Sequence, residues 1–307
     1  MNILPRRFRR GVPIISGARP LGRYKLKSVI GRGSAATVYR AHDGVFGRFV
    51  AIKVFDLEAS GNDMVLQEKE LRLLASLNHP GIVGLLDAGV DTSELGRPRA
   101  FLVMELASGD NLRNALASAP PTAEQIVVLG RDLADALRYL HGQEIVHRDI
   151  SPANVLLTQY GAGGGWRAKF GDFGISLQSG DLPGGYGSAT SGTAAYVSPE
   201  QLLGSGVGTP SDIYSLGLVL LECFTRRLAF PVATPETENV RLSTDPELPP
   251  GLPFEWRALI AAMTSRDQLE RPNAQEVFDA LCRIHEGRTG RHQLERQPEP
   301  QELPEAV

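Results

Sequence analysis

Cysteine is scarce in this sequence, and long apolar runs are missing from it. The two cysteines, Cys223 and Cys282, lie in apolar segments without metal-ligand spacing, so we predict reduced thiols, as is typical of a cytoplasmic protein. The longest apolar candidate, residues 213–224, is shorter than the ~20 residues of a membrane-spanning helix and contains Glu222. The apolar stretch that follows the first arginines covers only residues 12–15, which is too short for a secretory signal. We therefore expect no membrane span.

The chain also lacks a strong excess of charge of one sign. Its formal net charge is -3 over 307 residues, which gives no reason to expect nucleic-acid binding through bulk electrostatics. With 42% hydrophobic and 22% charged residues, the composition is that of a globular protein with enough apolar material for one or two cores. Lysine is rare, and arginine supplies most of the positive charge. The lysines are Lys25, Lys27, Lys53, Lys69 and Lys169.

The pattern of apolar residues divides the chain into a strand-rich part and a helical part. Short β-branched runs alternate with turn residues up to Met104, and helical spacing dominates after it. Strands are predicted at 24–27, 37–41, 49–55, 100–105, 155–157 and 168–170. Helices are predicted at 62–77, 122–141, 211–225, 254–265 and 274–285. Thr122 and Gln125 predict a capping box at the start of the long helix, so the pattern favours an α+β protein.

A glycine-rich turn lies between the first two predicted strands. Residues 30–38 read IGRGSAATV, and glycines let backbone N–H groups approach phosphate oxygens because no Cβ stands in the way. The turn alone is a weak signal, because 33 residues of this chain are glycine. Lys53 follows within the apolar run 49–55, where an ammonium group needs a partner. A lysine on an edge strand that points to solvent remains the alternative, but the spacing from Gly33 favours phosphate binding.

Two further motifs place carboxylates and an amide on neighbouring loops. Residues 147–154 read HRDISPAN and put Asp149 and Asn154 five positions apart, and residues 172–174 read DFG and add Asp172. Such oxygen ligands hold Mg²⁺ on a nucleotide, and one carboxylate orients a hydroxyl for phosphoryl transfer. A surface turn with a chance Arg–Asp pair explains the first motif alone, but it does not explain both.

Together these motifs resemble the catalytic and metal loops of protein kinases, in the style of bacterial eukaryotic-like Ser/Thr kinases, over about residues 24–285. The resemblance implies a bilobal fold, with a small antiparallel β-rich N-lobe that carries one key helix and a larger, mainly helical C-lobe. The polar composition after residue 286 predicts disorder. The expected divisions are a basic flexible arm at 1–21, the N-lobe at 22–107, the C-lobe at 108–286 and a disordered tail at 287–307.

The resemblance assigns a role to each catalytic candidate. Asp149 accepts or orients the proton of the substrate hydroxyl, and Asn154 and Asp172 ligate Mg²⁺ or Mn²⁺. Lys53 binds the phosphates of ATP. The predicted catalytic residues are Lys53, Glu70, Asp149, Asn154 and Asp172. The carboxylate that holds Lys53 is Glu70 by its position in the helix; Glu68 is the alternative, in the same predicted helix.

The resemblance also predicts an adenine pocket. The apolar strand and turn at 101–109 lead into the connection between the lobes, where backbone groups of Glu105 and Ala107 bond the adenine edge and Met104 closes the back. In isolation this segment is also compatible with a core strand that binds no ligand. The predicted nucleotide-binding residues are Ile30, Gly31, Gly33, Val38, Ala51, Lys53, Met104, Glu105, Ala107 and Leu156.

Residues 192–200, GTAAYVSPE, resemble the end of a kinase activation segment, in a form typical of Ser/Thr rather than Tyr kinases. Ser198 stands where alanine is usual. The resemblance implies that Glu200 pairs with Arg271 and that Asp212 binds the backbone of the catalytic loop. The candidate phosphorylation sites are Ser188, Thr190, Ser191 and Thr193. Chance hydroxyls in a loop explain each of these single sites equally well.

The catalytic loop departs from the family pattern at one point. Ser151 stands where Ser/Thr kinases carry a lysine, and Ala153 stands where tyrosine kinases place an arginine, so neither cation is present. Loss of one preorganised electrostatic donor costs on the order of 10²–10³ in rate, which slows an enzyme without abolishing its activity. Every metal-binding and proton-handling group is retained.

We therefore expect transfer of the γ-phosphoryl group of MgATP to Ser/Thr hydroxyls of proteins, with autophosphorylation of the activation segment. The alternative is a pseudokinase, which binds nucleotide and acts as an interaction module. A small-molecule kinase of the aminoglycoside phosphotransferase type is disfavoured by the motif at 192–200. The expected partners are protein substrates and the chain itself, with no nucleic acid. The sequence leaves the substrate, the activating signal and the oligomeric state open.

Overall fold

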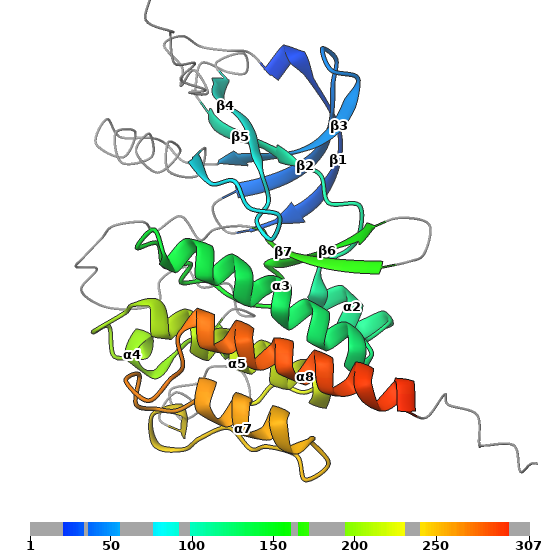
Figure 1. Ribbon diagram of the computed structural model, residues 1–307. Coiled ribbons are helices and arrows are strands. Elements are labelled where there is room, and N and C mark those ends of the chain that lie inside the picture. The colour runs from blue at the N-terminus through cyan, green and yellow to red at the C-terminus, as the bar shows by residue number, and fades with distance from the viewer. Residues whose placement is uncertain are drawn as a thin grey trace, which may run out of the picture.

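The structure is a computed structural model that describes residues 21–33, 36–55, 76–91, 99–160, 165–171, 194–230 and 240–294. A twisted β-sheet forms the upper part, and helices form the lower part (Figure 1). A two-stranded hairpin lies between them. The predicted α+β class and the two-part arrangement are confirmed, whereas the exact domain boundaries stay a prediction.

The upper part is a five-stranded antiparallel sheet with strand order β1-β2-β3-β5-β4. The strands are β1 (Tyr24–Arg32), β2 (Ala36–Asp43), β3 (Arg48–Phe55), β4 (Leu85–Asp91) and β5 (Arg99–Glu105). Four of these strands were predicted, although each is longer than its apolar run. One face carries the small core of this lobe, because side chains alternate between the two faces of a strand.

Strand β4 was not predicted, because its sequence LLDAGVD does not alternate clearly between apolar and polar residues. Asp87 in this strand accepts a hydrogen bond from the hydroxyl of Tyr24 at 2.8 Å. Gly89 lies against the ring of Phe101, and a Cβ at position 89 would stand 2.3 Å from Phe101 Cζ. A polar residue and a glycine therefore serve long-range packing here, and both weaken the local strand signal.

The hairpin of β6 (Val155–Tyr160) and β7 (Gly165–Phe170) connects the two lobes. A parallel bridge joins Ile82, ahead of β4, to Phe170, and an antiparallel bridge joins Asn111 to Leu156. On the lower side, the backbone N–H of Ala168 donates to Asp132 at 3.0 Å. The hairpin is therefore attached to both lobes through backbone hydrogen bonding.

The lower part packs around helices α3 (Ala123–His141) and α5 (Thr209–Thr225). The other described helices are α2 (Leu112–Ser118), α4 (Pro199–Leu202), α7 (Phe254–Met263) and α8 (Ala274–Leu294), with short 3₁₀ turns η1 (Leu21–Arg23) and η2 (Ala194–Tyr196). The capping box of Thr122 and Gln125 is present, as predicted. Helix α5 is buried on nearly all sides, which explains its continuous apolar sequence.

The helices of the structure differ from the predicted ones at two points. Helix α8 continues to Leu294, beyond the predicted end at residue 285 and into the predicted disordered tail. The short helices α2 and α4 were not predicted. The predicted helix at 62–77 lies outside the described residues except for its end, where Ser76 is helical. Both cysteines are free thiols, as predicted, and Cys223 is buried in α5.

Among the described residues, no helix is both long and apolar enough to cross a membrane.

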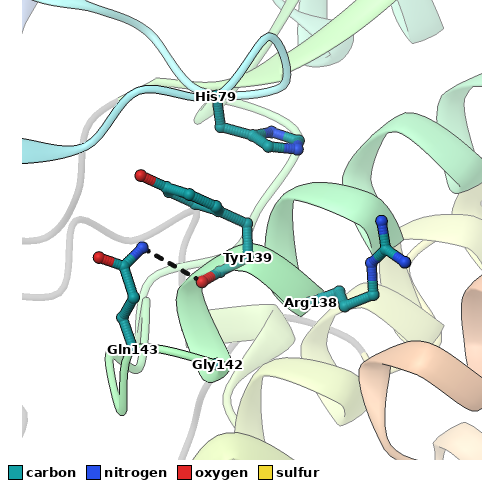
Figure 2. A pocket seen from close by; sticks show the side chains of 5 residues that line it. All are labelled: His79, Arg138, Tyr139, Gly142 and Gln143. Carbon is teal, nitrogen blue, oxygen red and sulfur yellow. Dashed lines mark hydrogen bonds between the residues drawn. The ribbon is translucent and has the colours of Figure 1, made fainter.

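An open hollow of about 480 Å³ lies where the segment before β4 meets the end of α3 (Figure 2). The ring of His79 stacks on the ring of Tyr139 with 5.0 Å between centroids. The hydroxyl of Tyr139 accepts a hydrogen bond from the backbone N–H of Asn78 at 3.0 Å. His79 and Arg138, which both line the hollow, contact Asp135 at 3.2 and 2.5 Å. These contacts indicate a structural joint between the lobes rather than a ligand site.

Candidate functional site

The catalytic-loop candidates Asp149 and Asn154 lie together between α3 and β6. The amide Nδ2 of Asn154 donates to the backbone oxygen of Asp149 and to its Oδ2, both at 2.8 Å. The backbone N–H of Asn154 donates to the carbonyl of Ser151 at 3.0 Å, which closes the loop into a tight turn. The side chain of Asn154 therefore fixes the carboxylate of Asp149 in one orientation.

Asp212, at the start of α5, holds the other side of this loop. Its carboxylate, which is 1% exposed, accepts from the backbone N–H groups of His147 and Arg148, both at 2.8 Å. His141 Nε2 lies 2.9 Å from the same carboxylate. Arg148 has a φ of 65°, a strained left-handed conformation for a non-glycine residue. The predicted contact of Asp212 with the loop backbone is confirmed, and it explains how the strained turn next to Asp149 persists.

The metal-binding candidates are Asn154 and Asp172, and Asp172 lies outside the described residues. The backbone N–H of Gly171, the residue before it, donates to the carbonyl of Asn154 at 2.8 Å. The chain therefore reaches position 171 directly beside Asn154. Because Asn154 uses Nδ2 for its bonds to Asp149, its Oδ1 is the atom that suits a cation. Within the described ranges, no group of three metal-ligating side chains is assembled.

Lys53 lies on β3 in a row that crosses the sheet. It pairs with Val38 on β2 and with Leu102 on β5, and Ala51 pairs with Met104. Directly paired residues and residues two positions apart share a face of a sheet, so Val38, Ala51, Lys53 and Met104 lie on one face. The apolar core of the lobe, which includes Val50, Ile52, Val54, Phe101 and Val103, occupies the opposite face. The sheet therefore gathers four of the predicted nucleotide-binding side chains.

The glycine-rich turn begins at the end of β1. Gly31 pairs with Val38, and the N–H of Gly33 donates to the carbonyl of Ala36 at 2.9 Å. Ile30 is 49% exposed. These positions fit the predicted roles, which stay predictions.

Glu105 ends β5 and starts the connection between the lobes, which also contains Ala107. The backbone N–H of Glu105 donates to Gly84 O at 3.0 Å, and the predicted role of Glu105 in binding adenine stays a prediction. Its side-chain Oε1 accepts from the N–H of Gly84 at 3.1 Å and from Lys169 Nζ at 2.5 Å. Sequence reasoning missed this ion pair. The ion pair of Glu105 and Lys169 joins residues 64 positions apart and holds the connection between the lobes against β7.

Leu156, the candidate for the lower wall of the adenine pocket, lies on β6. It pairs with Lys169, and its backbone is bridged to Asn111, at the end of the connection. Within that connection, a Cβ at Gly109 would stand 2.1 Å from the carbonyl oxygen of Leu157, so only glycine allows this close approach. The connection and the hairpin therefore hold Leu156 beside the segment that carries Glu105 and Ala107.

The predicted pair of Glu200 and Arg271 is confirmed. Two guanidinium nitrogens of Arg271 lie 2.7 and 2.9 Å from the carboxylate oxygens of Glu200. Ser211 Oγ adds a third bond to this carboxylate at 2.6 Å. Burial opposes ionisation of Glu200, but the hydrogen bonds from Arg271 and Ser211 hold its pKa below the ordinary value. This buried network fixes the start of α4.

Ser198, the unusual residue of this segment, caps α4. Its side chain accepts from the backbone N–H of Gln201 at 3.4 Å, and Gln201 Oε1 accepts from the N–H of Ser198 at 3.0 Å. Gln201 Nε2 also donates to the carbonyl of Arg148 at 3.0 Å, which ties α4 to the catalytic loop. Sequence reasoning missed this role, although the spacing Ser-Pro-Glu-Gln carries the signal of a capping box.

Ser151, where the family lysine is absent, is fully buried. Its side chain is 0% exposed, and among the described residues no hydrogen-bond partner of its Oγ is present. The catalytic loop therefore offers no cation of its own at this position. The remaining site predictions, Glu70 with its alternative Glu68 and Asp172, lie outside the described residues. So do the four candidate phosphorylation sites, Ser188, Thr190, Ser191 and Thr193.

Comparisons with known proteins agree with this geometry. The family model described as protein kinase domain matches residues 24–281. The probable serine/threonine-protein kinase SCO3848 of Streptomyces coelicolor is 41% identical over 215 residues, which cover 68% of this chain and 31% of that protein. The DNA damage-responsive serine/threonine-protein kinase RqkA of Deinococcus radiodurans is 39% identical over 214 residues, which cover 68% of this chain and 30% of RqkA.

The serine/threonine-protein kinase PknA of Mycobacterium tuberculosis is similar over a longer stretch. It is 33% identical over 294 residues, which cover 92% of this chain and 64% of PknA. The matched region thus amounts to less than a third of the first two relatives and to less than two thirds of PknA.

Proposed function

Because this chain belongs to the protein kinase domain family, we propose that it transfers the γ-phosphoryl group of ATP to Ser or Thr hydroxyls of proteins. The observation that carries this proposal is the catalytic loop. Asn154 binds the carboxylate of Asp149, and Asp212 fixes the loop backbone from the opposite side. Such an arrangement supports a carboxylate that is preorganised for proton handling. The names of the three relatives support Ser/Thr rather than Tyr as acceptor.

In this mechanism the residues of the chain position the two reactants. Protein kinases in general use ATP and Mg²⁺, and here Asn154 Oδ1 together with Asp172 suits the metal, which neutralises phosphate charge when bound. Lys53 holds the phosphates beneath the glycine-rich turn. The substrate oxygen attacks the γ-phosphorus as the bond to the ADP oxygen breaks, and the hydroxyl proton passes to the carboxylate of Asp149. Asn154 keeps that carboxylate in place during the transfer.

The test is incubation of the purified chain with Mg²⁺ and γ-labelled ATP beside the Asp149→Asn variant. We expect label on the parent or on a generic protein substrate and at least about 10²-fold less with the variant, because general-base catalysis contributes at least that factor. Equal labelling by both would show that Asp149 is not the base. ATP binding without any transfer would favour the pseudokinase alternative, with Ser151 as the leading explanation.

Mapping of the label tests autophosphorylation at Ser188, Thr190, Ser191 and Thr193, and Mn²⁺ in place of Mg²⁺ tests the metal preference. A cytoplasmic location, predicted from the thiols, also stays a prediction.

A further inference from the structure

A buried arginine that the catalytic mechanism does not use lies in the helical segment at residues 240–243. Arg241 is 2% exposed. Its Nη1 donates to the carbonyls of Ala194 at 2.8 Å and Val197 at 2.9 Å, and its Nη2 donates to the carbonyl of Ala195 at 3.1 Å. The guanidinium carbon lies 5.0 Å from the ring centroid of Phe230, within range of a cation–π contact. One side chain therefore binds three carbonyls of a single short segment.

The fourth carbonyl of this segment is bound as well. Ser215 Oγ, on α5, donates to the carbonyl of Tyr196 at 2.8 Å, and the Tyr196 hydroxyl donates to the carboxylate of Glu222. Residues 194–197 contain only one 3₁₀ turn, so helix or sheet hydrogen bonds do not define their path. Because buried carbonyls must be paired, the partners on other elements determine the conformation of this segment. Arg241 supplies three of the four.

The segment lies directly beside the catalytic loop. Ser198 follows it and caps α4, and Gln201 in α4 donates to the carbonyl of Arg148, the residue before Asp149. Residues 194–197 are therefore joined through α4 to the backbone beside Asp149, where the proposed function requires an acceptor hydroxyl. A shift of this segment would change the surface that an acceptor peptide meets there.

We infer that Arg241 is a positioning residue for the protein substrate: it fixes residues 194–197 and so sets how the acceptor hydroxyl and its neighbouring residues meet Asp149. This inference rests on the proposed function. Its chemistry requires arginine, because a planar guanidinium reaches several carbonyls at once, whereas a lysine ammonium is a single point charge on a flexible stem. Arg241 thereby complements Arg271, which fixes the next stretch of chain through the carboxylate of Glu200.

The experiment compares the parent with Arg241→Met, Arg241→Lys and the control Arg257→Met. Arg257 is a matched control because its guanidinium also donates to backbone carbonyls in this lobe, those of Leu248 and Pro249. An arrayed library of Ser/Thr peptides gives the sequence preference around the acceptor, and the best peptide gives kcat and KM. Thermal unfolding gives the folded fraction of each variant, and hydrogen–deuterium exchange reports on residues 194–198.

Arg241→Met is expected to raise KM for the peptide about tenfold or more and to broaden the sequence preference, because a misplaced segment presents the acceptor poorly. KM for ATP should stay within about twofold, since the nucleotide contacts are not touched. Amides of 194–198 should exchange faster, and Arg241→Lys should lie between Met and the parent. Arg257→Met should leave the peptide KM, the preference and this exchange unchanged.

An unchanged peptide KM and preference in folded Arg241→Met would overturn the inference. So would a loss that follows the folded fraction alone, with both KM values intact, because that result indicates a structural role only. If the parent itself transfers no phosphate, the proposed function has failed separately. The inference is then decided by exchange of residues 194–198 and by binding of the same peptides, and unchanged exchange would contradict it.

Discussion

The two lobes position their site residues by different means. In the sheet, strand register and alternation place Val38, Ala51, Lys53 and Met104 on one face. In the helical lobe, the catalytic loop depends on buried polar side chains from distant parts of the chain, above all Asp212.

This difference has an energetic consequence. A register is distributed over many backbone hydrogen bonds, so we expect the fold to stay intact when one side chain on the face of Lys53 is changed. In a buried ion pair, two side chains alone hold the backbone segments together. Removing one of them leaves the other as a buried charge without a partner. Substitutions on this face of the sheet should therefore change the phosphotransfer rate but not the free energy of unfolding. Substitutions in the buried polar network of the helical lobe should change both.

The largest effect on stability is expected for Arg271→Met. The substitution leaves the buried carboxylate of Glu200 without its cation, so the free energy of unfolding should fall by about 3–5 kcal/mol. Urea denaturation of the parent and the variant measures this difference. The double variant Glu200→Gln/Arg271→Met should recover part of the loss, because it removes the unpaired charge. A single variant as stable as the parent would show that the pair is not important for folding.

Lys53→Met tests whether a substitution in the sheet lowers activity without lowering stability. Removing one electrostatic donor to the phosphates should lower the phosphotransfer rate by about 10²–10³-fold. The melting temperature should stay close to that of the parent, because Lys53 is only half-buried on the face opposite the core. Rate assays and thermal unfolding on the same samples give both values. Unchanged turnover would mean that the nucleotide pocket is misassigned.

Gly89→Ala tests the close contact between Gly89 in β4 and the ring of Phe101. The added Cβ would meet the ring of Phe101, so the variant should lose about 1–3 kcal/mol of stability through overpacking. Chemical denaturation measures the loss. Gly84→Ala is a suitable control, since a Cβ at Gly84 has open space around it. Equal stability of the two variants would contradict this account of β4.

Ser151→Lys tests whether a lysine introduced at the position where Ser/Thr kinases carry one raises the phosphotransfer rate. A lysine at this position adds a donor for the transferred phosphate, and we expect the rate to rise about tenfold. The gain should fall short of the full contribution of such a donor, because position 151 is fully buried and the longer side chain must displace its neighbours. Steady-state phosphotransfer measures it, with Ser151→Ala as control. A rate equal to that of the control would show that the lysine does not reach the phosphate.

The smallest effect is a pH dependence in the sheet. A hydrogen bond from Arg23 to Asp43 holds the pKa of this carboxyl at about 2, against an ordinary value of 3.8. A carboxyl with a depressed pKa stabilises the fold fully above its unfolded-state pKa, and this contribution disappears as the pH falls from about 4 to about 2. We expect a contribution of about 1 kcal/mol, since Arg23 is partly exposed. Denaturation curves at several pH values should show a smaller acid-induced loss in Asp43→Asn, and identical pH profiles would contradict the assignment.

Local sequence signals predicted the elements that are regular and well capped. The capping box of Thr122 and Gln125 needs only neighbouring residues, and the apolar run at β3 alternates across a sheet. The contacts of Asp212 with the loop and of Arg271 with Glu200 were predicted only because the motifs resemble a known family, since no local rule pairs residues 65 or 71 positions apart. Both predictions are confirmed.

The contacts that were missed have no local signature. Arg241 reaches acceptors 44 to 47 residues away, and the pair of Glu105 and Lys169 spans 64 residues. The sequence around an arginine or a lysine does not predict a backbone or carboxylate partner at such a distance. The capping box of Ser198 and Gln201 is an exception, because the spacing of these two residues carries its signal, whereas the second bond of Gln201, to the carbonyl of Arg148, has no local signal.

The residue types and their order can be read along the chain without a structure: the glycine-rich turn, the lysine, the acidic loop and the closing Pro-Glu motif, with serine in place of lysine at position 151. Which buried polar groups meet, and which backbone segments they hold, depends on how the elements pack. The physical reason is that spacing along a chain encodes contacts within one helix or strand. Pairing of Asp212, Arg271 or Arg241 with its partners arises only when separate elements pack around a common core.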